Sequence, residues 1–300
     1  MQIGIDLGAT KIEYVLLDNQ NKELTRSRIP TPKNYNETII SIIAIIKNIE
    51  NKNKENLNIG ICHPGATDKT TGLIKNAHNS QWLNDKNLIK DLKNKINNNI
   101  YLENDANCFC LSEAYDGSAS HYETVFGIIL GSGCGGGLVI NKKIISGSNG
   151  LGGEWSLNQM PDLDIPNLKS GNKLDFSNRI EGYLSGKSIE KNFKIKYKKD
   201  LTAKEIFSKY RKNDNDAKNF INDYKNKLAK SLIIIITTID PDAIVFGGGI
   251  SNEIDFLDEI KLLTSKLINE PNLKTVFLKP LYGDASGVRG AALLGRDNFI

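Results

Sequence analysis

The sequence has few of the features that signal a metal centre or a disulfide framework. It contains four cysteines in 300 residues: Cys62, Cys108, Cys110 and Cys134. Only Cys108 and Cys110 are close in sequence, and on a helix they would lie on different faces. Without a CxxC spacing, the cysteines indicate neither a zinc site nor disulfides. We therefore expect reduced thiols and a cytoplasmic protein.

Long apolar runs and blocks of like charge are also missing. The most apolar run, residues 232–236, is far shorter than the roughly 20 residues needed to cross a bilayer. The chain opens directly into an expected strand over residues 2–7, so we expect no signal peptide. The net charge is only +4, and the lysines are scattered among Asn and Glu. We therefore expect neither a membrane nor a nucleic-acid partner.

The composition is that of a globular protein of two domains, or one large domain. Apolar residues make up 39% and charged residues 25% of the 300 positions. Runs of apolar residues predict strands, and apolar residues repeating every three to four positions predict helices. Together they indicate an α/β fold. Strands are expected at residues 2–7, 12–17, 22–29, 58–62, 100–102, 125–130, 138–140, 144–146, 243–246 and 275–278, and helices at 37–49, 88–96, 106–115, 252–268 and about 284–294.

One polar stretch, Glu103-Asn104-Asp105, falls between a short strand and a helix. A side chain at such a junction commonly faces a cleft in an α/β protein. The Asp105 carboxylate could accept a proton from a bound hydroxyl, as in phosphoryl-transfer enzymes. Asn and Asp are also good helix N-caps, so this stretch alone leaves a purely structural role open.

A glycine turn follows the first strand. Gly8, Ala9, Thr10 and Lys11 would present backbone N–H groups, a hydroxyl and an ammonium group to an anion such as a phosphate. Asp6, at the end of the strand, could hold Mg²⁺ through water. An ordinary hairpin is the alternative, because Gly and Asp are common in hairpin turns.

The second half of the chain repeats this plan and adds another glycine site. Five glycines stand among the seven residues Gly131, Ser132, Gly133, Cys134, Gly135, Gly136 and Gly137. Each glycine costs about 0.5–1 kcal/mol in a regular element, so close approach of the backbone to a ligand explains the turn better than packing does. Gly247, Gly248 and Gly249 end a buried strand, where a nucleotide base or ribose can lie flat. Two similar halves facing Asp105 would hold one nucleotide between them.

The loop over residues 66–83 is long for a compact domain, and such loops are often functional. It carries Asn76, His78, Asn79 and Trp82, which suit recognition of a polyol. An ordinary surface histidine is the alternative for His78.

With these motifs in place, nearly the whole chain resembles the ROK family of sugar kinases. The matching stretches are DLGATK at residues 6–11, ENDAN at 103–107, GSGCGGG at 131–137, GEW at 153–155, GGGIS at 247–251 and GVRGAA at 287–292. TGLIKNA at 71–77 and NSQWLN at 79–84 look most like bacterial fructokinases of the mannofructokinase type, with N-acetylglucosamine kinases as the nearest relatives.

The resemblance implies an actin-like, ribonuclease H-like fold of two α/β domains with the active site in the cleft between them. The domains would cover residues 1–117, completed by a helix at about 284–300, and residues 118–283. Asp105 would be the general base, with Gly65, Asn79, Asn104, Glu154 and Glu181 near the sugar hydroxyls. Asp6 would steer Mg²⁺, residues 8–11 and 131–137 would cradle the phosphates of ATP, and residues 247–249 would flank the adenosine. A homodimer is also implied.

The chain departs from the family at its zinc loop. The family usually carries a histidine and three cysteines there, and this sequence has Leu157, Asn172, Leu174 and Arg179 instead. Leu and Arg side chains do not bind zinc. We expect the loop to be held by packing of its apolar residues Leu163, Ile165, Leu168, Leu174 and Phe176. In the family the histidine also touches the sugar, so Leu157 removes one polar contact and weakens discrimination between sugars.

The sequence as a whole predicts transfer of the γ-phosphoryl group of ATP to the 6-hydroxyl of a hexose, with fructose as the leading substrate. N-acetylglucosamine, mannose and glucose are alternatives. A degenerate kinase that senses sugar, a ROK-type repressor and an actin- or chaperone-like ATPase are the rival classes. No helix-turn-helix fits before the first strand, and Glu154, Glu181 and the Asn79 loop favour a small polar substrate.

The loss of the zinc ligands gives a first prediction. Purified protein should contain far less than one zinc per chain when its metal content is measured by mass spectrometry. About one zinc per chain would contradict this interpretation of Leu157 and Arg179.

Overall fold

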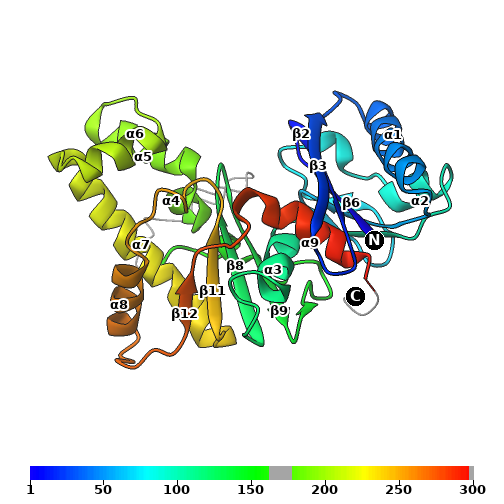
Figure 1. Ribbon diagram of the computed structural model, residues 1–300. Helices are drawn as coiled ribbons and strands as arrows, with labels where there is room; N and C mark the ends of the chain where they lie inside the picture. The colour runs from blue at the N-terminus through cyan, green and yellow to red at the C-terminus, as the bar shows by residue number, and fades with distance from the viewer. Residues whose placement is uncertain (162–177, 297–300) are drawn as a thin grey trace. The chain divides into compact units, whose positions relative to one another are not determined.

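The computed structural model describes residues 1–161 and 178–296 and divides into two compact units. Unit 1 comprises residues 1–123, 137–153 and 281–300, and unit 2 comprises residues 124–136 and 154–280. Figure 1 shows the elements of both units along the chain. The expected residues Leu163, Ile165, Leu168, Asn172, Leu174 and Phe176 lie outside the described residues.

Unit 1 is built on a sheet with helices on both faces. Its elements are β1 Gln2–Leu7, β2 Lys11–Leu17, β3 Glu23–Pro30, α1 Tyr35–Asn53, β4 Asn58–His63, β5 Ala66–Thr67, β6 Ile74–Lys75, η1 Gln81–Leu83, α2 Leu88–Lys93, β7 Ile100–Asn104, α3 Asp105–Tyr115, β10 Lys143–Ile144, η4 Gly283–Ala285 and α9 Ser286–Leu294. Unit 2 holds β8 Thr124–Leu130, η2 Trp155–Leu157, α4 Glu181–Leu184, α5 Gly186–Tyr197, α6 Ala203–Arg211, α7 Asn215–Ile239, β11 Ala243–Gly247, α8 Leu257–Leu267 and β12 Val276–Leu278, and β9 Cys134–Ile140 crosses the unit boundary.

The two five-stranded sheets share one plan, as the repeated sequence pattern predicts. The first has the order β3-β2-β1-β4-β7, and the second has the order β10-β9-β8-β11-β12. In the first, β1, β2 and β3 pair antiparallel, whereas β1, β4 and β7 pair parallel. In the second, β9 and β10 pair antiparallel, and β8, β11 and β12 pair parallel. The expected two-sheet α/β class is therefore confirmed.

The two faces of the first sheet are covered in different ways. Ile3 and Ile5 of β1 are fully buried in one cluster with Ile42 and Ile46 of α1. Gly4 lies between them in sequence, so it points to the opposite face. A Cβ on Gly4 would lie 2.2 Å from the Val288 carbonyl oxygen of α9, and one on Gly60 only 1.7 Å from that of Ala291. Helix α9 therefore rests directly on the backbone of β1 and β4.

Helix α3 is packed against α9 with the same closeness. A Cβ on Gly290 would lie 1.8 Å from the Cys108 carbonyl oxygen. The small-residue pattern of residues 287–292 predicts this tight packing. Because α3 begins at Asp105, the position of that residue depends on the α3–α9 contact.

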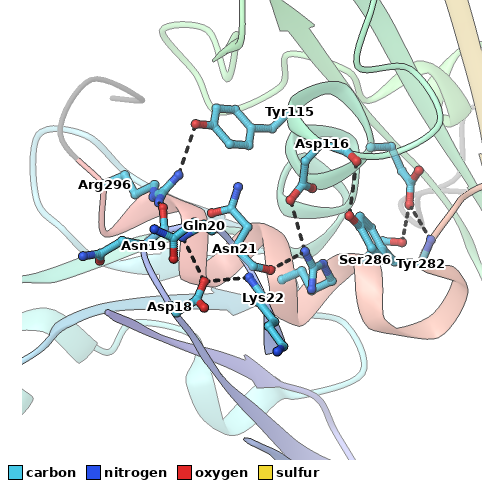
Figure 2. A network of polar contacts seen from close by, with 12 residues as sticks. Asp18, Asn19, Gln20, Asn21, Lys22, Tyr115, Asp116, Tyr282, Ser286 and Arg296 are labelled. Carbon is cyan, nitrogen blue, oxygen red and sulfur yellow. Dashed lines mark hydrogen bonds and ion pairs between the residues drawn. The ribbon is translucent and has the colours of Figure 1, made fainter. Parts of the chain in front are cut away.

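A polar network joins α9 to the β2–β3 turn and to the end of α3 (Figure 2). Arg289, with 6% of its side chain exposed, pairs with Asp116 at 3.1 Å and donates to the Asn21 carbonyl at 3.0 Å. Its guanidinium lies 3.8 Å from the centroid of the Tyr282 ring. Arg296 donates to the Asn19 carbonyl and, at 3.2 Å, to the Tyr115 hydroxyl.

Unit 2 carries its longest helix, α7, against α6 and α8 (Figure 1). Lys225 of α7 is almost fully buried, and its ammonium group donates to Glu259 and to the Tyr210 hydroxyl, both at 2.7 Å. The same group lies 4.3 Å from the Phe256 ring centroid. The stem of this lysine is thus buried while its charge stays paired.

The structure differs from the sequence expectations in four places. The glycine turn is shorter than expected, because β9 begins at Cys134 and Gly135 to Gly137 belong to that strand. The helix expected over 252–268 begins at Leu257, since residues 250–254 form turns closed by the Glu253 and Ile254 amides. The loop over 66–83 contains a short β5–β6 hairpin and a 3₁₀ turn. No element was expected over residues 181–239, which hold four helices.

In the described ranges, no helix is long and apolar enough to span a membrane.

One fully buried carboxylate fixes the chain where it re-enters unit 1. Glu113 of α3 accepts from the Leu281 amide at 2.9 Å, the Tyr282 amide at 3.2 Å, the Ser286 hydroxyl at 2.6 Å and the Ser118 amide at 2.9 Å. All four partners are donors. A carboxylate, which only accepts, therefore suits this position better than an amide does.

Glu113→Gln should destabilise unit 1, because the new NH₂ group would face N–H and O–H donors. We expect a loss of about 1–3 kcal/mol in the free energy of unfolding, measured in urea. Glu123→Gln, at an exposed position, is the matched control and should change stability by less than about 0.5 kcal/mol. Equal stability of the two variants would show that the four contacts of Glu113 contribute little.

Candidate active site

The predicted site residues of unit 1 gather at one edge of its sheet. Strands β1, β4 and β7 are parallel, so their carboxyl ends meet there. The register aligns Asp6 with Cys62 and Cys62 with Glu103. Asp105 and the loop through Gly65 follow directly after β7 and β4. The carboxyl edge of a parallel sheet is the usual place for a ligand in an α/β protein.

Asn104, and not Asp105, is the N-cap of α3. Its side-chain oxygen accepts from the amides of Ala106 at 2.8 Å and Asn107 at 3.2 Å, and its NH₂ group donates to the Gly65 carbonyl at 2.9 Å. Asp105 is the first helical residue, and one of its oxygens accepts from the Ala106 amide at 2.8 Å. The structural role left open by the sequence thus belongs mainly to Asn104.

Gly65 occupies a position that only glycine fits. Its φ is +83°, and a Cβ there would lie 2.4 Å from the Lys75 carbonyl oxygen. The tight contact brings the β6 strand of the long loop beside the Asn104–Gly65 pair. Asn79, in contrast, is exposed on the turn of residues 78–79.

Asp6 is held in a buried environment. Burial raises the pKa of its carboxyl, while a hydrogen bond with the Cys62 thiol lowers it. A hydrogen bond with Cys108 and burial raise the pKa of Cys62 well above its usual value, so this thiol stays neutral. Cys62 was not among the expected site residues. Cys62 ends its strand just before Gly65 and lies opposite Asp6 in the sheet. Aligning the two strands in the sequence could have revealed this neighbour of Asp6.

The turn over residues 8–11 is a tight hairpin turn with exposed Ala9 and Thr10. The Gly8 amide donates to the Lys11 carbonyl at 3.0 Å, and the Thr31 hydroxyl donates to the Gly8 carbonyl at 2.8 Å. The Lys11 ammonium group pairs with the Glu13 carboxylate at 2.8 Å, and Arg26 also bonds Glu13, at 2.6 Å. The Lys11 side chain therefore lies along β2. The sequence predicted that its ammonium group faces an anion, and the pairing with Glu13 was not predicted.

His63 is a buried neutral group next to this edge. Its Nδ1 lies 2.9 Å from the Pro64 carbonyl oxygen, and its Nε2 lies 2.9 Å from the Thr67 hydroxyl. Burial lowers the pKa of His63 to about 4, although the contact with Pro64 opposes this. Its two contacts fix the chain that leads into Gly65.

In unit 2, the glycine turn at residues 131–133 and the first residues of β9 are held through their carbonyl groups. The Gly131 carbonyl accepts from the Gly186 amide at 2.7 Å, and the Gly133 carbonyl accepts from the Gly131 amide at 2.9 Å. The Cys134 carbonyl accepts from the Ser156 hydroxyl at 2.8 Å, and the Gly135 carbonyl from the Trp155 indole at 3.0 Å. The GEW motif therefore supports the turn through Trp155, a role that its sequence pattern did not reveal.

Two carboxylates, Glu154 and Glu181, belong to this same region. One oxygen of Glu181 accepts from the Cys134 amide at 3.4 Å, so Glu181 lies against the glycine turn. Burial, and then the charge of Glu181, raise the pKa of Glu154. The structure thus brings the two expected sugar ligands of unit 2 together, beside the expected phosphate turn.

The third glycine site leaves bare backbone at the end of β11. Gly248 has a φ of +85°, and a Cβ there would lie 2.5 Å from the Leu130 carbonyl oxygen, so a side chain does not fit. Gly249 is exposed, with no atom within 4 Å of the place of a Cβ. This backbone can accept a flat ligand. Within the described part of the chain, no group of three or more His, Cys, Asp or Glu side chains could hold a metal ion.

The fold and these sites define a class of α/β proteins with an actin-like fold. A solved ROK hexokinase from Thermus thermophilus matches with a TM-score of 0.85 and 22% identity, covering 98% of this chain and 97% of that one. The model of the ROK family matches residues 2–298, so the chain belongs to the ROK family.

Two curated relatives are similar along almost their whole length. The N-acetyl-D-glucosamine kinase of Haemophilus influenzae (strain 86-028NP) is 35% identical, covering 98% of this chain and 99% of the relative. The N-acetyl-D-glucosamine kinase of Pasteurella multocida (strain Pm70) is 34% identical, with the same coverage. The expected family is thus confirmed. The expected closeness to fructokinases is not supported by these relatives.

The buried His63 gives a pH-dependent prediction. Its pKa is about 4 in the folded chain and about 6.5 unfolded, so the unfolded chain binds more protons between these values. Stability therefore falls as the pH drops through this window, by about 2–3 kcal/mol from His63 between pH 7 and pH 4.5. His63→Gln should lose less stability over this range in urea unfolding. The exposed-site control His121→Gln should behave as the wild type, and equal pH slopes in all three proteins would refute the assignment.

Proposed function

We propose that this protein is an ATP-dependent N-acetyl-D-glucosamine kinase that transfers the γ-phosphoryl group to the 6-hydroxyl of the sugar. The observation that carries the kinase reaction is the carboxyl edge of the first sheet, where Asp105 opens α3 beside the Asn104–Gly65 contact. The choice of sugar is supported by relatives that are 34–35% identical over 98% of the chain. It takes the place of fructose as the leading substrate.

Asp105 is the general base in this proposal. The first turn of a helix favours an anion, so this position suits a carboxylate that accepts the proton of a hydroxyl. Asn104 accepts two backbone hydrogen bonds and uses one of its two amide hydrogens on Gly65. Its second amide hydrogen can therefore donate to a sugar hydroxyl. Gly65, Asn79, Glu154 and Glu181 are the further sugar-binding residues.

The glycine sites bind ATP in the same proposal. Residues 8–11 and 131–137 offer backbone N–H groups to the phosphates, and residues 247–249 lie against the adenosine. Asp6 fits a role toward Mg²⁺, because one carboxylate together with water and phosphate oxygens is the ligand set that Mg²⁺ prefers. Bound Mg²⁺ would neutralise charge on the phosphates.

Several finer expectations stay predictions. These are the homodimer, the cytoplasmic location, the absence of zinc and the domain bounds 1–117 with 284–300 and 118–283. Fructose, mannose and glucose stay as alternative substrates. A sugar-sensing protein without activity is the remaining alternative. We consider it less consistent with the sequence, because such a protein would not need the base Asp105 or the glycine sites for ATP.

Turnover of purified protein should be highest with N-acetylglucosamine in a coupled ADP-release assay run with ATP–Mg²⁺ against a panel of hexoses. Asp105→Asn keeps the shape of the residue but removes the base, so we expect kcat to fall about 10²–10⁴-fold. Sugar binding, followed by calorimetry, should remain within a few-fold of wild type. Highest turnover with fructose would contradict the proposed substrate and support the fructokinase predicted from the sequence. Near-normal turnover of Asp105→Asn would refute the role of Asp105 as the base.

A further inference from the structure

The contact between Glu181 and the glycine turn points to a role beyond binding sugar. One oxygen of Glu181 lies 3.4 Å from the Cys134 amide nitrogen. A Cβ on Gly133 would lie 2.7 Å from the same oxygen, so the carboxylate lies directly against the backbone of the turn. Glu181 is thus seated on the side of the turn that carries a backbone N–H group.

The turn does not need Glu181 to keep its shape. Donors from Gly186, Trp155 and Ser156 hold its carbonyls at 2.7–3.0 Å. The Glu181 contact is longer, and a hydrogen bond of 3.4 Å is weak. Helix α4 is held separately, because the Ser188 hydroxyl donates to the Glu181 carbonyl at 2.9 Å. The carboxylate can therefore leave the turn without loss of the surrounding structure.

The same N–H group is one that a phosphate would use. A carboxylate and a phosphate are both anions, so they compete for the Cys134 amide and repel each other there. Glu154 adds a second acidic group beside Glu181, and burial, followed by the charge of Glu181, raises the pKa of its carboxyl. A sugar hydroxyl that donates to Glu181 would give this carboxylate another partner, away from the turn.

We propose that Glu181 is a positioning residue that couples the two substrates. Without sugar, its carboxylate holds the Cys134 N–H and weakens binding of the nucleotide phosphates. Bound sugar draws the carboxylate away and leaves the N–H to a phosphate. This inference rests on the proposed function, because it takes the hexosamine and ATP as the ligands of Glu181 and of the turn.

Calorimetry with a non-hydrolysable ATP analogue and Mg²⁺ tests the coupling directly. In the wild type, N-acetylglucosamine should tighten binding of the analogue by a factor within the usual range of about 5–150. Glu181→Gln removes the charge, so its sugar-free affinity for the analogue should be about tenfold tighter than wild type. The added effect of sugar should shrink accordingly. Glu123→Gln, at an exposed position, is the charge-matched control.

A second measurement uses the wild-type chain and so does not depend on a variant that folds. With only four cysteines, protein labelled with ¹⁵N-cysteine gives four backbone amide signals, and Cys134→Ser identifies the one from Cys134. Addition of N-acetylglucosamine alone should shift the Cys134 signal. In Glu181→Gln this signal should be displaced before sugar is added and should respond less to it.

The two proposals fail in distinguishable ways. Absence of phosphoryl transfer to every sugar of the panel would overturn the proposed function. A wild type that phosphorylates sugar, together with a Glu181→Gln protein whose sugar-free analogue affinity is unchanged or weaker, would overturn the coupling alone. A Cys134 signal that ignores the sugar in the wild type would overturn it too.

Discussion

The close contact of helix α9 with the backbone of β1 and β4 is the constraint on which the rest of unit 1 depends. Gly4 and Gly60 leave no room for even a methyl group against the carbonyls of α9. Gly290 of α9 in turn lets α3 approach to the same degree. Because protein interiors transmit small displacements, any side chain added at these points would move α3. The N-terminus of α3 carries Asn104 and Asp105, so packing far from the carboxyl edge sets the geometry of that edge.

Buried polar groups complete what this packing begins. Glu113 and Arg289 lie on the two helices that touch, and each joins its helix to chain that would otherwise be a free connection. Their partners are mainly backbone groups, which a substitution elsewhere does not remove. A buried charge is costly unless its hydrogen bonds are made, so these networks permit essentially one arrangement of α3 and α9. The frame is thus specified by glycine contacts and by paired buried charges together.

The glycine turn of unit 2 is held mainly through hydrogen bonds to its carbonyl groups and to those at the start of β9. Trp155 and Ser156 reach back to the carbonyls of Gly135 and Cys134, and Gly186 reaches that of Gly131. A backbone fixed in this way is preorganised for a negatively charged ligand. Glu181 contacts the Cys134 amide of this turn, and this contact is the basis of the proposed coupling between sugar and phosphate.

The sequence by itself determined the repeated strand–turn–strand plan, the placement of Asp105 at a strand–helix junction and the glycine positions. These features are local, since apolar alternation and glycine spacing act within a few residues. The division of labour between Asn104 and Asp105, the pairing of Lys11 with Glu13 and the seat of Glu181 on the glycine turn were decided only by the tertiary structure. Asn104 also bonds Gly65 after another strand, Glu13 is shared with Arg26 of β3, and Glu181 contacts a turn far away in the sequence. These contacts cannot be read from one chain segment alone. The predicted glycine turn was too long for the same reason. Strand pairing in the second sheet makes Cys134 to Gly137 part of β9.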